Sequence, residues 1–310
     1  MGKGKITVFG SFVVDLAFRT PKLPIKGETI KGLSYTMGPG GKGSNQAVAA
    51  KRAGADVIMI TRVGADPFAN FAFESFQKEG LDTRYIFKDL KEKTAVAAIL
   101  VDDNSGENQI VVTLGACLHF TDNEIDSIRA LIANSEYLLV QLESNLDAIE
   151  RVIQIAYDER VKVILNPAPA AQLPDSLLKM VDILTPNETE AAILAGLDIN
   201  QSDQPNNIKK AADILLGKGI NTLIITLGDK GVFLKALNIE KSYPALAVKA
   251  VDTTGAGDAF NGGLATALSE GKNLDEAIRF ANIVGGLSVT REGAAQSMPY
   301  RDEIEKWLKK

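Results

Sequence analysis

One glycine-rich run has the residue types needed to transfer a phosphoryl group. Residues 252–263 read DTTGAGDAFNGG, and from Asp258 onward apolar residues recur at helical spacing to near Gly271. Gly255 and Gly257 therefore open a helix, where backbone N–H groups and the helix dipole favour an anion. An acidic residue in the first turn also stabilises a helix without any chemistry. Beside a phosphate, however, a carboxylate is suited to take the proton of an attacking hydroxyl, so the run predicts an anion site next to a general base.

A second glycine-rich run, GGKGSNQA, occupies residues 40–47. It is not a Walker A loop, because Gly43 follows Lys42 where that loop requires Ser or Thr. Gly38, Gly40 and Gly43 match the spacing of a dinucleotide fingerprint. No clear buried strand precedes them and no well-placed ribose carboxylate follows, so an oxidoreductase is not favoured.

Four shorter runs lie between these two, in the following order: QLE at 141–143, NPAP at 166–169, PNETE at 186–190 and TLGDKG at 226–231. Together the six runs resemble, in the same order, the motifs of the ribokinase-like carbohydrate kinases. The resemblance covers essentially the whole chain. It identifies the run at 40–47 as a sugar-binding loop, about 30 residues after a Gly10-Ser11 turn with Asp15 beyond it.

The resemblance also implies roles for individual residues. The catalytic positions are Asp258 as the base, with Gly255, Ala256 and Gly257 as the anion hole. The positions matching the sugar site are Val13, Asp15, Gly41, Lys42, Gly43, Asn45, Glu143 and Asp258. The positions matching the ATP site are Asn187, Thr226, Leu227, Gly228, Asp229, Lys230, Gly231, Gly257 and Asn282. Carboxylates and amides suit a polyol, because they pair with its hydroxyl groups.

Two cations are implied in the same way. Glu190, one helical turn beyond Asn187, is expected to organise Mg²⁺ through water, although a charge at a helix N-terminus is its simpler explanation. The positions matching a potassium site are Asp252, Thr254, Ser288, Arg291, Gly293 and Ser297. Arg291 could contribute only its carbonyl oxygen, because its side chain has no acceptor.

The chain departs from the family pattern at two places. Val13 stands where the family carries an Asn two residues before the sugar-binding Asp15, so one sugar hydroxyl loses a partner. Cys117 follows Gly115 and Ala116 where an Asn is usual, and we expect it to be a small buried hydrophobe. His119 is expected on a loop or at the surface.

Composition excludes several classes of protein. The 310 residues are 45% hydrophobic and carry a formal net charge of −5 without a basic block, which gives no support for binding to nucleic acid or to an anionic membrane. One Cys and one His exclude an intramolecular disulfide and a His/Cys zinc cluster. No signal peptide or transmembrane run is apparent, so a cytoplasmic enzyme is expected.

The remaining pattern predicts an α/β fold of three layers, with a mostly parallel sheet between helices. Residues 161–165, 181–184 and 222–226 are predicted as buried strands, whose following loops should converge with the glycine turn on one crevice. Residues 12–37 and 94–113 carry β-prone runs instead and are predicted to form a discontinuous β lid, with residues 1–11, 38–93 and 114–310 forming the α/β domain. The resemblance implies that the lid covers the sugar and pairs with its copy in a homodimer.

These observations predict an ATP-dependent sugar kinase whose substrates are small molecules, and whose motifs are most similar to those of enzymes that phosphorylate the 5-hydroxyl of D-ribose. A kinase of 2-deoxyribose, of another sugar or of a nucleoside on the same fold stays open. A phosphorylated sugar is less favoured, because only Arg19 and Lys22 could add positive charge near Asp15. From a different class, a non-catalytic sugar-binding regulator also stays open.

Overall fold

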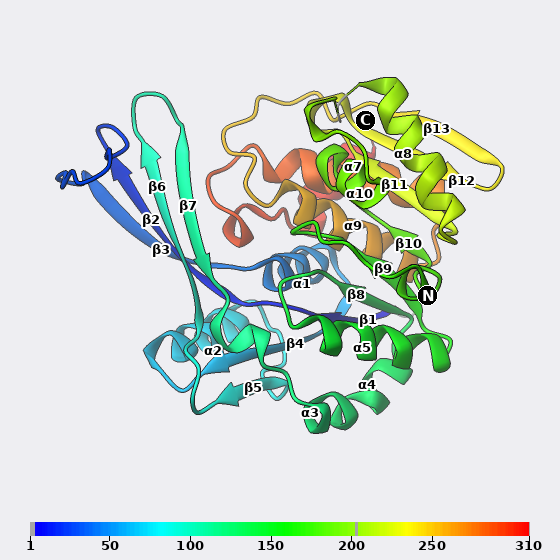
Figure 1. The fold of residues 1–310 in the computed structure, drawn as a ribbon, viewed down its shortest axis with the longest axis horizontal. Coiled ribbons are helices and arrows are strands. Elements are labelled where there is room, and N and C mark those ends of the chain that lie inside the picture. The colour runs from blue at the N-terminus through cyan, green and yellow to red at the C-terminus, as the bar shows by residue number, and fades with distance from the viewer. Residues whose placement is uncertain (1–3, 202–203, 310) are drawn as a thin grey trace.

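A nine-stranded sheet runs through the centre of the protein, in a computed structural model that describes residues 4–201 and 204–309 (Figure 1). Its strand order is β13-β12-β11-β10-β9-β8-β1-β4-β5. The pairs from β11 through to β5 are parallel, and only β12 and β13 at one edge pair antiparallel. The bounds are β1 Lys5–Phe9, β4 Asp56–Gly64, β5 Ile86–Asp89, β8 Tyr137–Val140, β9 Lys162–Leu165, β10 Ile183–Leu184, β11 Thr222–Thr226, β12 Val232–Ala236 and β13 Ile239–Tyr243.

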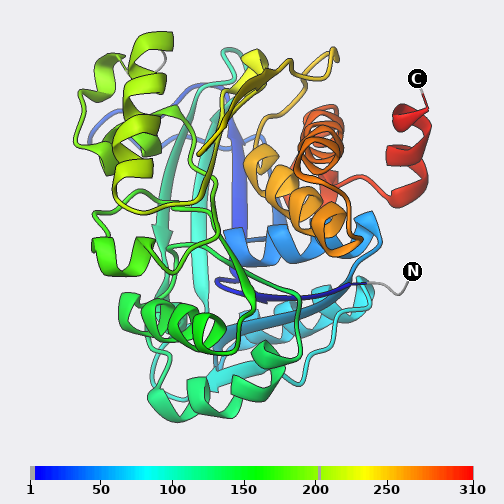
Figure 2. The same ribbon diagram turned by 90° about the vertical axis from the view of Figure 1, so that its right-hand side faces the viewer.

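Helices cover both faces of this sheet, because its strands are apolar on both sides. In β4, Val57 and Met59 join the core on one face, while Ile58 and Ile60 join the core on the other. Figure 2 shows the two helical layers on either side of the strands. On one face lie α1 Lys42–Ala53, α2 Pro67–Lys78, α9 Ala256–Ser269, α10 Leu274–Ser288 and α11 Arg301–Leu308. On the other lie α3 Asp122–Ser127, α4 Arg129–Ala133, α5 Leu146–Asp158, α6 Asp175–Leu178, α7 Glu188–Ala195 and α8 Pro205–Gly217.

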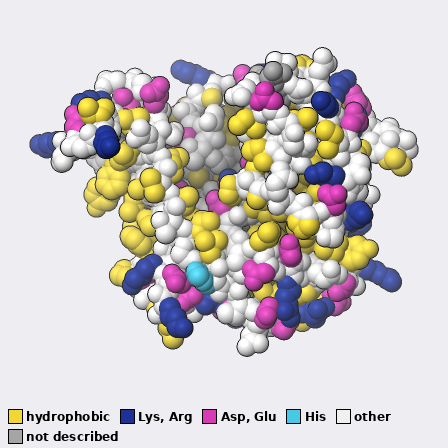
Figure 3. Space-filling model, viewed as in Figure 1, with side chains coloured by type: hydrophobic (Ala, Val, Ile, Leu, Met, Phe, Trp, Pro, Cys, Tyr) yellow, Lys and Arg dark blue, Asp and Glu magenta, His cyan; other side chains and the backbone are white. Residues whose placement is uncertain are grey.

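A separate four-stranded sheet, here called the lid sheet, projects from the body of the molecule (Figure 1). Its order is β3-β2-β6-β7, with bounds β2 Val13–Thr20, β3 Ser34–Gly40, β6 Ala95–Asp102 and β7 Asn108–Thr113. Figure 3 shows a hollow between this sheet and the rest of the protein, with hydrophobic side chains gathered on the sheet. The predicted fold class, a three-layer α/β fold with a small additional β-sheet, is confirmed.

Details of the strands and helices differ from the prediction. The predicted strand at 181–184 shrinks to Ile183–Leu184, and the strand at 161–165 begins at Lys162. The glycine run at 40–47 is not a loop, because Gly40 ends β3 and α1 begins at Lys42. The strand β3, which pairs with β2 along residues 34–40, does precede this run, but it is not a buried strand of the kind that a dinucleotide fingerprint follows. The alternation that marks a buried strand is missing there because residues 34–37 are exposed.

Four short 3₁₀ helices complete the structure, at Gly115–Leu118, Ile199–Gln201, Gly228–Lys230 and Ala295–Ser297. Among the helices of residues 4–201 and 204–309, none has the length and apolar character needed to cross a membrane.

Candidate active site

Helices α1 and α9 pack so closely that the two glycine-rich runs meet. A side chain at Gly262 on α9 would place its Cβ 2.6 Å from Ala49 Cβ and 2.7 Å from the carbonyl oxygen of Gln46, both on α1. At the start of α1, a Cβ at Gly43 would come within 2.7 Å of the backbone at Gly10 and Ser11. The glycines therefore permit a backbone approach that other residues would block. This approach brings residues 45 and 46 next to Asp258.

Asp258 lies in the first turn of α9, as predicted, and is 6% exposed. Its two carboxylate oxygens accept hydrogen bonds from two amides of α1: Oδ2 from Asn45 Nδ2 at 2.9 Å, and Oδ1 from Gln46 Nε2 at 2.9 Å. Asn45 Oδ1 is buried and has no hydrogen-bond partner within the described residues. A buried orphan acceptor beside a carboxylate fits a ligand hydroxyl, because leaving it unsatisfied costs free energy.

The other predicted sugar-site residues surround this pair. Glu143 accepts from the backbone N–H of Lys42 at 2.9 Å and from Ser11 Oγ at 2.5 Å. Gly40 makes room for Asp15, because a Cβ there would lie 2.1 Å from Asp15 Oδ2. Gly41 caps α1 at a φ of 88°, which glycine adopts readily. The structure thus brings Asp15, Lys42 and Glu143 to the same end of α1.

Charge is concentrated here. Burial, with the nearby charges of Glu143 and Asp258, raises the pKa of Asp15 to about 7. Burial of Lys42 opposes its charge, but the carboxylates of Asp258, Glu143 and Glu190 outweigh it, so the pKa of Lys42 is raised and the side chain stays charged. A half-buried cation among carboxylates is suited to orient polar groups and to attract a phosphate.

We expect Asp15→Asn to stabilise the sugar-free protein at about pH 8. Asp15 has a pKa of about 7 in the folded protein, whereas in the unfolded chain its pKa is about 4. Between about pH 4 and pH 7, Asp15 is therefore protonated in the folded protein and ionised in the unfolded chain. The free energy of unfolding therefore falls as pH rises through this window, and the neutral amide avoids that loss. Thermal unfolding midpoints across this pH range measure the effect. A difference between variant and wild type that does not shrink toward acid pH would contradict it.

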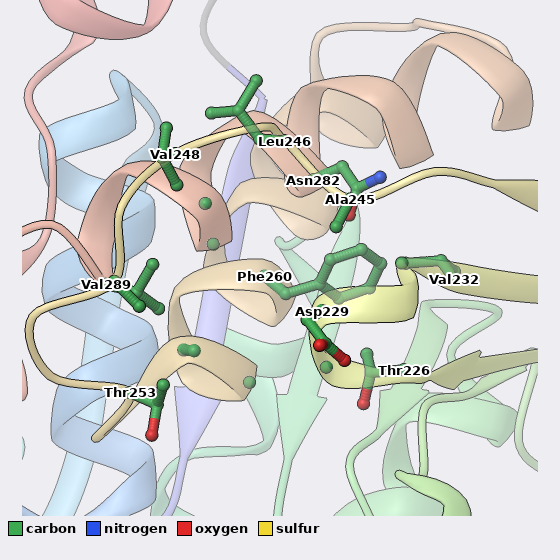
Figure 4. Close-up of a pocket in the computed structure, with 17 residues that line it drawn as sticks. Thr226, Asp229, Val232, Ala245, Leu246, Val248, Thr253, Phe260, Asn282 and Val289 are labelled. Carbon is green, nitrogen blue, oxygen red and sulfur yellow. The ribbon is translucent and has the colours of Figure 1, made fainter. Parts of the chain in front are cut away.

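A cavity of about 240 Å³ lies beside the glycine turn, away from Asn45 and Gln46 (Figure 4). Six residues predicted for the nucleotide line it: Thr226, Gly228, Asp229, Gly231, Gly257 and Asn282. Because Gly257 lines this cavity and Asp258 meets Asn45, the turn stands between the two parts of the site. Leu227 and Lys230, also predicted, belong to the same turn but are not among the lining residues.

Sequence reasoning missed the apolar walls of this cavity. Figure 4 shows them as Val232, Ala245, Leu246, Val248, Phe260 and Val289, with Ala250, Gly285 and Gly286 completing the wall. The pair Gly285-Gly286 inside α10 was the feature of the sequence that could have indicated a segment packed closely against this helix. In the structure, a Cβ at Gly286 would lie 2.5 Å from Leu246 Cβ. Asn282 donates to the carbonyl of Pro244 at 2.7 Å, which holds this segment over the helix. A cavity with apolar walls of this kind suits an aromatic group.

Asn187 and Glu190 form a capping box at the start of α7. Asn187 Oδ1 accepts from the Glu190 N–H, and Glu190 Oε2 accepts from the Asn187 N–H, both at 2.8 Å. Glu190 thus has the structural role of a helix-terminal charge. Burial nevertheless raises its pKa, and it interacts electrostatically with Lys42 and Asp258 across the site.

The residues predicted for potassium come from two stretches, 252–254 and 288–297, which Asp252 ties together. Its Oδ1 accepts from the N–H and hydroxyl of Thr254, and its Oδ2 accepts from the N–H of Gly293 at 2.9 Å. Arg291 directs its side chain to Glu303, so only its backbone is available. The hydroxyls of Ser288 and Ser297 donate to the carbonyls of Gly285 and Ala294. Backbone and hydroxyl oxygens of this kind suit a hard cation.

The two departures from the family pattern lie in one apolar cluster. Val13 and Cys117 pack together with Ala95 and Ala97 at the base of the lid sheet. Cys117 is fully buried, as expected, and burial raises the pKa of its thiol to about 12. His119 is at the surface, also as expected, with a half-exposed side chain.

Comparison with known proteins places this site in a family. The family model described as pfkB family carbohydrate kinase matches residues 3–301. The chain is 45% identical to the ribokinase of Haemophilus influenzae over 98% of both chains, and 36% identical to a deoxyribokinase of Salmonella typhi, again over 98% of both. The solved structure of Arabidopsis thaliana ribokinase complexed with ribose and ATP is similar over 100% of both chains, with 29% identity and a TM-score of 0.90. The chain therefore belongs to the pfkB family of carbohydrate kinases.

Proposed function

We propose that this protein transfers the γ-phosphoryl group of ATP to the 5-hydroxyl of D-ribose, giving D-ribose 5-phosphate and ADP. The observation that carries the proposal is the position of Asp258, whose carboxylate is buried against Asn45 one residue beyond Gly257 at the nucleotide cavity. A base on one side of a glycine turn and a nucleotide on the other is the arrangement that direct phosphoryl transfer requires. The ribokinase relatives support the substrate.

In this mechanism Asp258 accepts the proton of the attacking hydroxyl. Asn45, Asp15 and Glu143 hold the other sugar hydroxyls, and the orphan Asn45 Oδ1 accepts one of them. The N–H groups at the start of α9, following Gly255 at a φ of 75°, stabilise the negative charge on the transferred group. Lys42, as a half-buried cation, adds to that stabilisation.

The nucleotide base would occupy the apolar slot lined by Phe260 and Leu246. The loop from Thr226 to Gly231, with Asn187 bridged to Thr226, would lie along its ribose and phosphates. Glu190, which interacts electrostatically with Lys42 and Asp258, would hold Mg²⁺ through water, and the ion would neutralise phosphate charge.

Potassium is proposed to bind the segments joined by Asp252. It would be held by carbonyl and hydroxyl oxygens of Asp252, Thr254, Ser288, Arg291, Gly293 and Ser297. A cation there fixes the loop that leads into the glycine turn. We therefore expect turnover to be several-fold higher in potassium than in sodium buffers of equal ionic strength. Initial rates in the two salts measure this, and equal rates would rule the cation site out.

The lid sheet is proposed to close over the sugar, as a unit formed by residues 12–37 and 94–113 on an α/β domain of the remaining residues. Closure excludes water, which would otherwise accept the phosphoryl group. Its exposed apolar residues, among them Ile110, Val111 and Tyr35, support a homodimer through this sheet. Light scattering gives the mass in solution, and a monomer at working concentration would contradict the dimer.

The test of the sugar is ADP release with ATP, Mg²⁺ and potassium across D-ribose, 2-deoxy-D-ribose, fructose, fructose phosphates and nucleosides. We expect ribose to give the highest kcat/KM. A clear preference for 2-deoxyribose would favour the second candidate, a deoxyribokinase, which the Salmonella relative and the apolar cluster around Val13 support. Silence with every sugar would favour a sugar-binding regulator.

Val13→Asn is expected to raise the preference for ribose over 2-deoxyribose by about tenfold. The amide would supply a hydrogen bond to a hydroxyl that now meets an apolar wall, an interaction of about 1–1.5 kcal/mol. The ratio of kcat/KM for the two sugars is the readout. Val13→Leu, which keeps the wall apolar, is the control. An unchanged ratio in the Asn variant would show that residue 13 does not face the sugar.

A further inference from the structure

A chain of buried amide side chains runs from the interior of the sheet to Asp258. Gln46, on α1 and 0% exposed, donates from Nε2 to Asp258 Oδ1 at 2.9 Å and to Asn166 Oδ1 at 3.0 Å. Its own Oε1 accepts from Gln141 Nε2 at 2.7 Å. Gln46 therefore uses both amide hydrogens and its oxygen in contacts with protein groups.

The Asp258 carboxylate, which can only accept hydrogen bonds, determines which way the Gln46 amide faces. If that amide turned over, its oxygen would face the Asp258 carboxylate and the Asn166 oxygen, and its hydrogens would face the Gln141 amino group. Three hydrogen bonds would become contacts between like partners, inside a region where unmade hydrogen bonds are costly. Gln46 is thus held as a donor toward the carboxylate.

The same series of hydrogen bonds continues from Asn166 to the glycine turn. Asn166 Nδ2 donates to the carbonyl of Thr185 at 2.9 Å, and Thr185 Oγ1 donates to Asn261 Oδ1 at 2.6 Å. Asn261 Nδ2 then donates to the carbonyl of Gly257 at 2.8 Å. Asp258 and the turn in front of it are therefore both anchored to the ends of the strands through one buried network.

We propose that Gln46 is the positioning residue of the catalytic base: its donated hydrogen bond orients the Asp258 carboxylate relative to the glycine turn. This inference rests on the proposed function, in which Asp258 takes the proton of the sugar hydroxyl. Gln46 acts through Asp258, whose other oxygen is held by Asn45 on the sugar side. A hydrogen bond to the ionised form of a carboxylate stabilises that form.

Other charges act on the base, and a substitution at residue 46 leaves all of them in place. They are Asp15 on β2, Lys42 on α1 and Glu190 on α7, while Glu143, after β8, acts on Asp15 and Lys42. A change in the pH dependence of turnover in a Gln46 variant therefore reports the altered contact between residue 46 and Asp258.

Gln46→Glu is the decisive variant, because it has nearly the same shape and turns a donor into a carboxylate facing Asp258. Two carboxylates in one buried site favour the protonated, inactive form of the base. We expect kcat with ribose at pH 7 to fall at least about tenfold, with the KM for ATP within about threefold of wild type. We also expect the acid limb of the kcat profile to move up by about one pH unit or more, so that turnover recovers in alkaline buffer. An acid limb at the wild-type position would overturn the proposal.

Gln154→Glu is the matched control. Gln154 lies on the exposed face of α5 and donates to Asp158 Oδ1 at 2.8 Å, so the same substitution there creates the same pair of carboxylates outside the site. Its acid limb should match wild type. If thermal unfolding shows that Gln46→Glu does not fold, Gln46→Met removes the donors without adding charge and should shift the limb in the same direction. Wild-type turnover and an unshifted limb in Gln46→Met would overturn the proposal.

The outcome is separable from that of the proposed function. A wild-type protein that releases no ADP with any sugar, or an Asp258→Asn variant with full turnover, would overturn the proposed function. An active wild type with an inactive Asp258→Asn variant and an unshifted acid limb in Gln46→Glu would overturn the positioning role alone.

Discussion

Asp258→Asn should lower kcat by at least about 10²-fold, the contribution of a well-placed general base. The amide cannot accept the proton of the sugar hydroxyl at neutral pH. It also offers only one acceptor to Asn45 and Gln46, which now donate to separate oxygens. One of those buried donors must lose its partner, which costs about 1–3 kcal/mol of stability. A lower kcat with a modestly lower melting temperature is the expected result.

Steady-state kinetics with ribose and ATP measure the effect, and calorimetric ATP binding is the control. ATP affinity should change little, because the apolar slot lined by Phe260 and Leu246 is untouched. A variant that turns over at near the wild-type rate would remove Asp258 as the base. A variant that loses ATP binding together with turnover would show instead that the substitution damages the turn.

Gly262→Ala should reduce both stability and turnover. The added methyl would lie 2.6 Å from Ala49 Cβ, 2.7 Å from the backbone carbonyl oxygen of Gln46 and 2.8 Å from the backbone nitrogen of Ala50. Helix α1 must therefore move away from α9. Overpacking of this kind costs about 1–3 kcal/mol. The movement also lengthens the contacts from α1 to Asp258, and misplacement of a catalytic group by about 1 Å lowers the rate by about 10²-fold.

Urea unfolding and kcat together test this prediction. The matched control is Gly217→Ala, at the exposed end of α8, where a Cβ meets no atom within 4 Å and the backbone is not left-handed. The free energy of unfolding of that variant should rise by about 0.4–1 kcal/mol, because Ala lowers the conformational entropy of the unfolded chain. Its activity should not change. If Gly262→Ala retained both stability and kcat, the close approach of α1 and α9 would not be what aligns the base.

The sequence predicted much of the fold for a local reason. Strands such as Thr222–Thr226 are short apolar runs ended by turn residues, and parallel strands are apolar on both faces, so each is visible in a few consecutive residues. The β-prone runs of the lid were visible in the same way. The predicted lid ended at residue 37, whereas β3 continues to Gly40 and leads directly into the glycine run, and its exposed residues 34–37 carry no buried alternation.

Some features of the candidate site could also be predicted from the sequence, and others could not. The glycine turn and the acid of its first helical turn follow from the spacing of Gly255, Gly257 and Asp258, which is local chemistry at a helix start. The contacts of Gln46 do not, because Gln46 donates to a carboxylate 212 positions away and accepts from Gln141, 95 positions away.

By itself, the sequence determined the chemistry of this protein: an anion site, a carboxylate behind it, and the α/β framework that displays them. Only the tertiary structure decided how that carboxylate is held, which apolar segments form the nucleotide slot, and that Val13 belongs to an apolar cluster with Cys117. Motifs record short-range backbone geometry, whereas these contacts depend on how closely α1, α9 and α10 pack. That packing follows from glycines such as Gly262 and Gly286. The residues that these glycines contact are distant in the sequence, so no local pattern predicts them.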